Sequence, residues 1–229
     1  MKATAVWAND NCVSNPLYID LIRKFLSLEM LCPYSVKFKY SDIGRLSFVS
    51  EPSAMHWSRK FEYSWAAINA ELNKDCFCLD TGSASAVFKY YLASRVKHVV
   101  CQDIDPVSLD LVAMTDIFRS YDNINMQVSD IGDLNPEEYD RSFCLSVLEH
   151  TVDPFQKFTK IVDSVKKGGI ALISMDVADK VTEDCSIDIN IAQKMCESVG
   201  IGLPEAKPKD TVAYFGNHTR RCLCIKVKK

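Results

Sequence analysis

The sequence Leu79-Asp80-Thr81-Gly82-Ser83-Ala84-Ser85-Ala86 continues the short apolar run Cys76–Leu79 and gives the strongest indication of the fold. Gly82 permits a tight turn, and the small serine and alanine side chains let the backbone approach a ligand closely. A helical pattern follows from about Ala86, so the stretch predicts a strand, a turn and a helix. In a doubly wound sheet, such a turn lies at the crevice beyond the carboxyl ends of the strands, where ligands bind.

Short apolar runs and longer helical patterns alternate on the carboxyl side of this turn. The runs are Val96–Cys101, Ile124–Val128, Ser142–Leu145 and Gly169–Ser174, and the helical patterns lie near Ala86–Leu92, Pro106–Tyr121 and Pro154–Val165. A helix around Ile187–Val199 and strands near Thr211–Phe215 and Arg221–Val227 complete the pattern. This alternation is typical of an α/β fold with a doubly wound, mostly parallel sheet and helices on both faces.

Residues 1–74 have a different texture. Apolar residues recur at helical spacing in Leu17–Leu26 and in Ser58–Leu72, while Val36–Tyr40 alternates like a short strand or an extended arm. We therefore expect two parts: a mainly helical N-terminal extension or lid over residues 1–74, and a Rossmann-like domain over residues 75–229.

Acidic side chains end three successive strands of the predicted sheet. Asp80 ends the first strand, Asp103 the second and Asp130 the third. Asp103 follows the Gly82 turn by about 20 residues, the spacing of an acid that binds ribose hydroxyls. A nicotinamide-dependent oxidoreductase is disfavoured, because Ala84 and Ala86 stand where the dinucleotide fingerprint requires glycine.

Together these pieces resemble the class I S-adenosylmethionine-dependent methyltransferases. The resemblance rests on Leu79-Asp80-x-Gly82, Asp103–Pro106, Ser129–Ile131, Tyr139-Asp140, Val147–His150 and Lys167–Gly169, in the family's order and spacing over about residues 75–175. It implies a sheet of seven strands with the last one antiparallel, and S-adenosylmethionine as cofactor, with S-adenosylhomocysteine as product. The family usually has two or three glycines in the first turn. The alanines here therefore leave open a catalytically silent protein that acts as a partner or binding module.

The resemblance also implies roles for individual residues. Asp103 would hold the ribose hydroxyls, Ile104 would pack on adenine, and Asp130 with the Ile131 backbone would bind the adenine amino group. The methionine end would be held by Asp80, Thr81, Gly82, the Ser146 carbonyl, and Arg59 and Tyr63 of a lead-in helix, with Arg59 on the carboxylate. The acids and the lead-in segment also have structural alternatives: the acids as turn or cap residues, with Asp105 the better cap for a helix starting at Pro106, and the lead-in segment as a surface helix packed on the sheet.

His150 is the histidine beside the predicted cleft. A neutral imidazole there could take a proton from an acceptor hydroxyl or amine as the methyl group moves. A histidine that tethers the following loop fits the sequence equally well.

Composition bounds the remaining choices. The net charge of −3 disfavours a dedicated nucleic-acid binder, and no apolar run approaches the ~20 residues of a membrane span. The ten cysteines include the pairs Cys76/Cys78 and Cys222/Cys224, whose spacing predicts buried thiols on one face of a strand rather than a metal site. We expect a cytoplasmic protein, monomeric or homodimeric, that acts on a small-molecule acceptor with an oxygen or nitrogen nucleophile.

Overall fold

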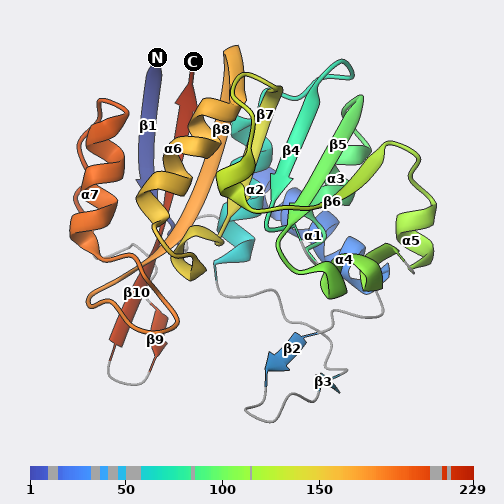
Figure 1. Cartoon of the computed structure of the whole chain (residues 1–229), viewed down its shortest axis with the longest axis horizontal. Helices are drawn as coiled ribbons and strands as arrows, with labels where there is room; N and C mark the ends of the chain where they lie inside the picture. The colour runs from blue at the N-terminus through green and yellow to red at the C-terminus, as the bar shows by residue number, and fades with distance from the viewer. Residues whose placement is uncertain are drawn as a thin grey trace.

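A computed structural model (Figure 1) describes residues 1–9, 15–31, 37–40, 46–49, 58–83, 86–113, 115–206, 213–215 and 218–229. Its strands are β1 (Lys2–Trp7), β2 (Lys37–Tyr40), β3 (Leu46–Val49), β4 (Phe77–Thr81), β5 (His98–Asp103), β6 (Ile124–Val128), β7 (Tyr139–Leu145), β8 (Val165–Ala178), β9 (Ala213–Phe215) and β10 (His218–Lys228). Its α-helices are α1 (Pro16–Leu31), α2 (Arg59–Asn69), α3 (Phe88–Ala93), α4 (Pro106–Ala113), α5 (Asp116–Arg119), α6 (Pro154–Ser164) and α7 (Ile189–Ser198). Two short 3-10 helices, η2 (Ile131–Asp133) and η3 (Leu148–His150), follow β6 and β7.

The main sheet has the strand order β1-β10-β8-β7-β4-β5-β6. Strands β4, β5, β6, β7 and β8 are parallel to one another, and β10 is antiparallel to β8. The predicted doubly wound, mostly parallel sheet is confirmed, including the antiparallel last strand. The order reverses between β4 and β7, which places the switch point, and hence the ligand crevice, at the carboxyl ends of those two strands.

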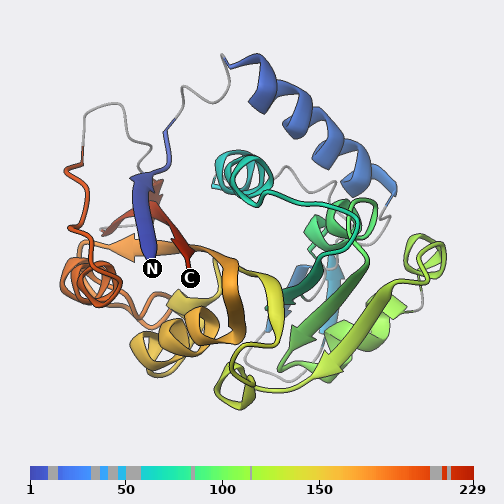
Figure 2. The same cartoon turned by 90° about the horizontal axis from the view of Figure 1, so that it is seen from above.

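Helices cover both faces of the sheet, as Figure 2 shows from above. On one face, α1, α2 and α3 contribute aromatic side chains to a core that contains Phe25, Tyr63 and Phe88. On the other face, α6 and α7 pack through Phe158, Ile161 and Met195. Because successive residues of a strand point to opposite faces, each buried strand contributes side chains to both cores.

Strand β1 occupies the edge place next to β10, in antiparallel register from Lys2↔Lys228 to Trp7↔Leu223. The expected boundary at residue 74 placed this segment in a helical extension, whereas its backbone is part of the main sheet. The reason is a period-two pattern: Ala3, Ala5 and Trp7 face the core while the residues between them are exposed. Residues 58–74 contribute the expected helix α2, which also packs on the sheet.

The segment predicted near Thr211–Phe215 does not take a central place in the sheet. Its described part, β9, pairs only with β10, in a hairpin register of His218↔Phe215. Strands β2 and β3 form a separate two-stranded sheet, and β2 matches the strand expected at Val36–Tyr40, except that Val36 lies outside the described residues.

The prediction of buried thiols is confirmed for the cysteines that the structure describes. All eight of them are free and buried, and both Cys-x-Cys pairs lie in one core. Among the described residues no cluster of histidine, cysteine or acidic side chains could hold a metal ion. Of the helices in the described ranges, none has the length and apolar character needed to cross a membrane.

Truncating Trp7 tests the place of β1 in the sheet. Trp7 is 4% exposed, and its indole Nε1 donates to the Pro204 carbonyl at 2.8 Å. We expect Trp7→Ala to lower the free energy of unfolding by about 3 kcal/mol in urea titrations. Thr4→Ala, on the exposed side of the same strand, should change it by less than about 0.5 kcal/mol. Equal effects from both variants would contradict a structural role for this strand.

Candidate functional site

The turn after β4 is closed by Gly82, which adopts a left-handed φ of +64°. Its backbone N–H donates to the Gln102 carbonyl at 2.8 Å, and a side chain at this position would collide with that of Val147. Residues 84 and 85 lie outside the described residues, so the first of the two alanines cannot be placed. Ala86 is not among the described residues with positive φ, so it carries no backbone strain.

One cavity of about 230 Å³ lies at this edge of the sheet. Six of the predicted site residues line it together: Gly82, Asp103, Ile104, Asp130, Ile131 and His150. The remaining lining residues are Gln102, Ser129, Val147, Thr151, Val152 and Lys157. The acids that end β5 and β6 therefore meet above the glycine turn, as their positions at strand ends require.

Asp103 and Asp105 have different roles: Asp105 caps a helix, and Asp103 lines the cavity. Asp105 accepts a hydrogen bond from the Val107 backbone N–H at 3.0 Å and so caps helix α4, as its position before Pro106 indicated. Asp103 accepts from the Asp105 N–H at 3.0 Å with one carboxylate oxygen and lines the cavity. The capping task therefore falls to Asp105, and Asp103 faces the site.

Asp130 is held by contacts within the chain. One oxygen accepts from the Gly132 N–H at 2.7 Å and caps η2, and the other accepts from Lys157 Nζ at 2.8 Å. The hydrogen bond from Lys157, followed by that from Gly132, holds the pKa of this carboxyl below its usual range. A carboxylate has about four acceptor positions, so these bonds orient Asp130 without exhausting it.

Apart from Gly82, the residues predicted for the methionine end are not among those that line the cavity. Tyr63 packs in the aromatic core, with its ring centroid 5.2 Å from those of both Phe25 and Phe88. Arg59 pairs with Glu62 one turn along α2, and its guanidinium also donates to the Leu145 carbonyl at 2.9 Å. In this structure α2 is thus anchored to the sheet through the arginine expected to bind a carboxylate.

The sequence did not predict a role for Glu62, which contacts the predicted site residues Arg59 and Ser146. The side chain is fully buried, and one of its oxygens accepts from the hydroxyls of Ser146 at 2.7 Å and Ser174 at 2.5 Å. Burial opposes its ionisation, but the charge of Arg59 and the serine hydrogen bonds outweigh burial and lower its pKa. The signal available in the sequence was the i, i+3 spacing of Arg59 and Glu62 on an amphipathic helix.

Ser146 stands directly after β7 with a left-handed φ of +51°. Such a conformation is unfavourable for a residue with a side chain, and it persists here because its surroundings hold it. The Ser146 N–H donates to the Ser174 carbonyl at 3.0 Å while its hydroxyl reaches Glu62. The backbone is therefore turned sharply at the point where the sheet meets the site.

Asp80 and Thr81 are buried at the carboxyl end of β4. Ser83 donates its hydroxyl to Asp80 at 2.9 Å. Burial raises the pKa of Asp80 to about 6, against the opposing charge of Lys89 and the Ser83 hydrogen bond. The Thr81 hydroxyl is buried without a hydrogen-bond partner in the described structure.

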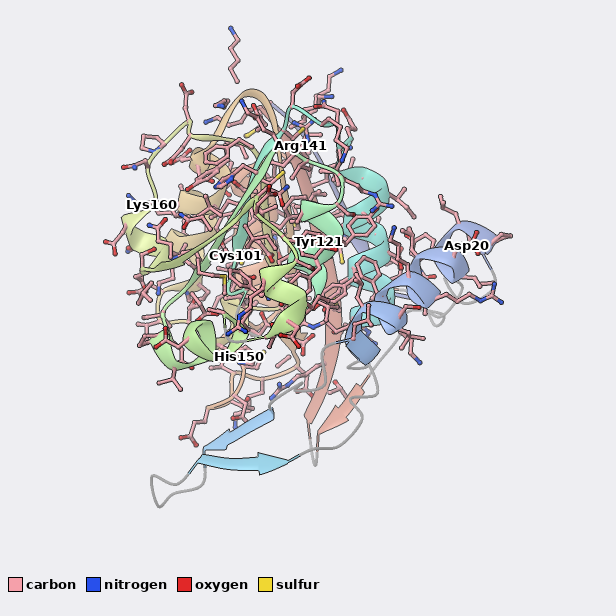
Figure 3. The ribbon with its side chains drawn as sticks, turned by 90° about the vertical axis from the view of Figure 1, so that its right-hand side faces the viewer. Asp20, Cys101, Tyr121, Arg141, His150 and Lys160 are labelled. Atoms are coloured by element: carbon pink, nitrogen blue, oxygen red, sulfur yellow. The ribbon has the colours of Figure 1, made fainter. Side chains whose placement is uncertain are left out.

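His150 lies beyond the carboxyl end of β7, whereas Arg141 lies near the start of that strand, and Figure 3 shows Arg141 in the upper part of the view and His150 in the lower part. Desolvation lowers the pKa of His150, assisted by the charges of Arg220 and Arg59 and opposed by a hydrogen bond with the Asp184 backbone. These effects together favour the neutral form of the imidazole. Its Asp184 contact also ties it to the loop after β8, in line with the tethering alternative.

Two further buried acids, Glu149 and Asp176, were not predicted. Glu149 accepts from the Asp176 N–H at 3.1 Å, and each side chain keeps one buried oxygen without a hydrogen-bond partner in the described structure. Burial raises the pKa of both, and the charges of neighbouring carboxylates raise them further. Glu149 was visible in the sequence as part of Val147–His150, but its partner lies 27 positions away on β8.

A pH titration of stability tests the protonation of this pair. A carboxyl whose pKa is raised by folding releases its proton on unfolding, so it makes the protein less stable as the pH rises above the ordinary carboxyl range of about 4 to 4.5. Glu149→Gln removes that contribution. We expect the free energy of unfolding of this variant, relative to wild type, to increase steadily between pH 5 and neutrality.

The difference in the free energy of unfolding between Glu149→Gln and wild type isolates the contribution of Glu149. The contribution of His150 changes with pH in the opposite direction, but it is present in both proteins and cancels in the difference. Glu183→Gln, an exposed change on the loop after β8, should run parallel to wild type. A constant difference between Glu149→Gln and wild type over this range would show that Glu149 is ionised in the folded protein.

Comparisons with known proteins agree with this geometry. Residues 79–173 match the family model of a methyltransferase domain, while no curated protein matches the chain significantly. A Bacillus halodurans protein assigned as a methyltransferase aligns with a TM-score of 0.58 and 14% identity over 73% of this chain and 98% of that one. The N-methyltransferase NodS from Bradyrhizobium japonicum gives a TM-score of 0.55 and 12% identity over 73% and 93%.

The cyclase SpnF gives a TM-score of 0.54 and 15% identity over 85% of this chain and 73% of that one. At these identities the likeness to solved structures concerns the fold alone. The chain has the class I methyltransferase fold that its sequence resembles, and residues 79–173 within it match the model of a methyltransferase domain.

Proposed function

We propose that this protein is an S-adenosylmethionine-dependent methyltransferase that methylates an oxygen or nitrogen of a small-molecule acceptor by in-line displacement. The observation that carries the proposal is the single cavity in which Gly82, Asp103, Ile104, Asp130 and Ile131 meet at the carboxyl edge of the sheet. This is the crevice where doubly wound folds bind their ligands.

The cavity suits the adenosine part of the cofactor. Two carboxylates and two isoleucines line it. The carboxylates can accept hydrogen bonds from ribose hydroxyls or an amino group, and the isoleucines can pack against the apolar face of a purine. Gln102 Oε1 and Ser129 Oγ are buried beside it without hydrogen-bond partners in the described structure, and a bound nucleoside could supply donors for them. Its volume of about 230 Å³ falls below the ~300–1,000 Å³ of most small-molecule pockets, as expected for a site that holds part of a ligand.

The methionine end requires movement of Val147. The Val147 side chain lies against Gly82, and Asp80, Thr81 and Ser146 are not among the residues that line the cavity. We propose that these residues, with Arg59 and Tyr63, receive the methionine portion once Val147 rotates. Arg59 would then share its guanidinium between Glu62 and the ligand carboxylate.

The cofactor supplies an electrophilic methyl group on a positively charged sulfur. The protein's contribution is to align an acceptor nucleophile with that methyl group and to exclude water, and such positioning can lower a barrier by several kcal/mol. His150, whose lowered pKa favours the neutral imidazole, is the candidate base for the acceptor proton. The loop between β8 and α7 lies next to His150 and would shape the acceptor pocket. An acidic chain favours a small acceptor over a nucleic acid, and the free cysteines favour a reducing cytoplasm.

The alternative is a silent protein that keeps the fold without methyl transfer. The observations that favour it are the Arg59–Glu62 pair and the Val147 side chain at the methionine end. The cyclase SpnF is similar in fold and bears the name of a different activity. Cofactor binding without turnover, or no binding, would support this reading.

Asp103→Ala tests the ribose assignment. We expect the dissociation constant of S-adenosylmethionine, measured by calorimetry, to rise roughly 10- to 100-fold, because hydrogen bonds to a charged group are lost. Asp105→Ala is the matched control, since it removes the helix cap two residues away and should leave affinity nearly unchanged. Unaltered affinity in Asp103→Ala would overturn the assignment.

His150→Ala separates a base from a structural tether. We expect cofactor affinity to stay within about twofold and methyl transfer to a panel of amines and alcohols to fall more than about 100-fold. A loss of turnover of tenfold or less would contradict the role of base and leave the contact with the Asp184 backbone as the function of this residue.

A further inference from the structure

Helix α3 carries a lysine at a position where a charge is unexpected. Lys89 is 0% exposed, although lysine is almost never fully buried unless its charge is compensated. Helix α3 is the first helix after the turn at Gly82. Lys89 therefore belongs to the strand–turn–helix unit that contributes Gly82 to the cavity.

The ammonium group points back at the turn. Lys89 Nζ donates to the carbonyls of Ser83, at 3.2 Å, and Ala86. The Ser83 hydroxyl in turn donates to Asp80, and the charge of Lys89 acts on Asp80. The Lys89 ammonium, Ser83 and the Asp80 carboxyl group are therefore connected through hydrogen bonds. Ser83 directly follows Gly82, which lines the cavity.

A buried charge beside the site changes the affinity for a charged ligand more than the affinity for a neutral one. S-adenosylmethionine carries a permanent positive charge on sulfur, and S-adenosylhomocysteine has a neutral sulfur in the same place. Charges interact over 10 Å or more in a poorly solvated interior, because neither salt nor water screens them fully. Lys89 disfavours the cationic sulfur, Asp80 favours it, and the adenosine part of both ligands is the same.

We propose that the buried pair of Lys89 and Asp80 sets the preference of this protein between S-adenosylmethionine and S-adenosylhomocysteine, with Lys89 acting against the charged cofactor. This inference rests on the proposed function, because it requires a site that binds both ligands. Lys89 is a specificity-determining residue that acts through the electrostatic field and the turn, and it does not touch the ligand.

The test is the ratio of the two dissociation constants, measured by calorimetry on the full chain. We expect Lys89→Met to shift this ratio roughly three- to tenfold toward S-adenosylmethionine, and Asp80→Asn to shift it by a similar factor toward S-adenosylhomocysteine. Lys157→Met is the matched control. It removes a cation at the adenosine cavity that is paired with Asp130 and reached by solvent, so its field on the sulfur is screened and both constants should change by the same factor.

A purely structural role of Lys89 predicts a different result, in which both ligands weaken equally and the ratio stays constant. Ratios within twofold of wild type in both Lys89→Met and Asp80→Asn would overturn the inference. If one variant does not fold, as circular dichroism would reveal, the sign of the shift in the other decides. Absence of binding of both ligands to the wild-type protein would instead reject the proposed function.

Discussion

The architecture of the site depends on one fully buried carboxylate. Glu62 links helix α2 to the end of β7 and to the neighbouring strand β8 through the hydroxyls of Ser146 and Ser174, while Arg59 neutralises its charge and reaches the Leu145 carbonyl. Breaking such a buried pair by removing one partner costs about 3–5 kcal/mol, because the remaining charge stays desolvated. The helix is therefore fixed in place over the switch point of the sheet, and the sharp turn at Ser146 is held by the same contacts.

This anchoring separates the site into two parts with different character. The part proposed for adenosine is formed by strand ends and short turns around the cavity. The part proposed for methionine includes Ser146, whose hydroxyl belongs to the network around Glu62. The Val147 side chain lies against Gly82 in this structure, so we expect ligand binding in the second part to require movement of that side chain.

Much of the fold could be predicted from the sequence because the deciding signals are local. The turn at Gly82 and the acids at Asp103 and Asp130 are read from neighbouring residues, and they do meet in one cavity. The Glu62 network could not be read in this way, since its serines lie 84 and 112 positions away along the chain. The edge strand at Lys2–Trp7 was missed although its alternation was visible, because its partner lies at the opposite end of the sequence.

The pairing of β1 with β10 has a consequence for biosynthesis. A ribosome makes β1 before any other described strand and makes its partner β10 after all of them. The edge of the sheet can therefore close only after translation of the last strand, and until then the apolar face of Trp7 has no place to bury. A chaperone that holds the emerging segment would find its target in these first residues, and a ribosome-stalled chain lacking β10 should expose them to protease.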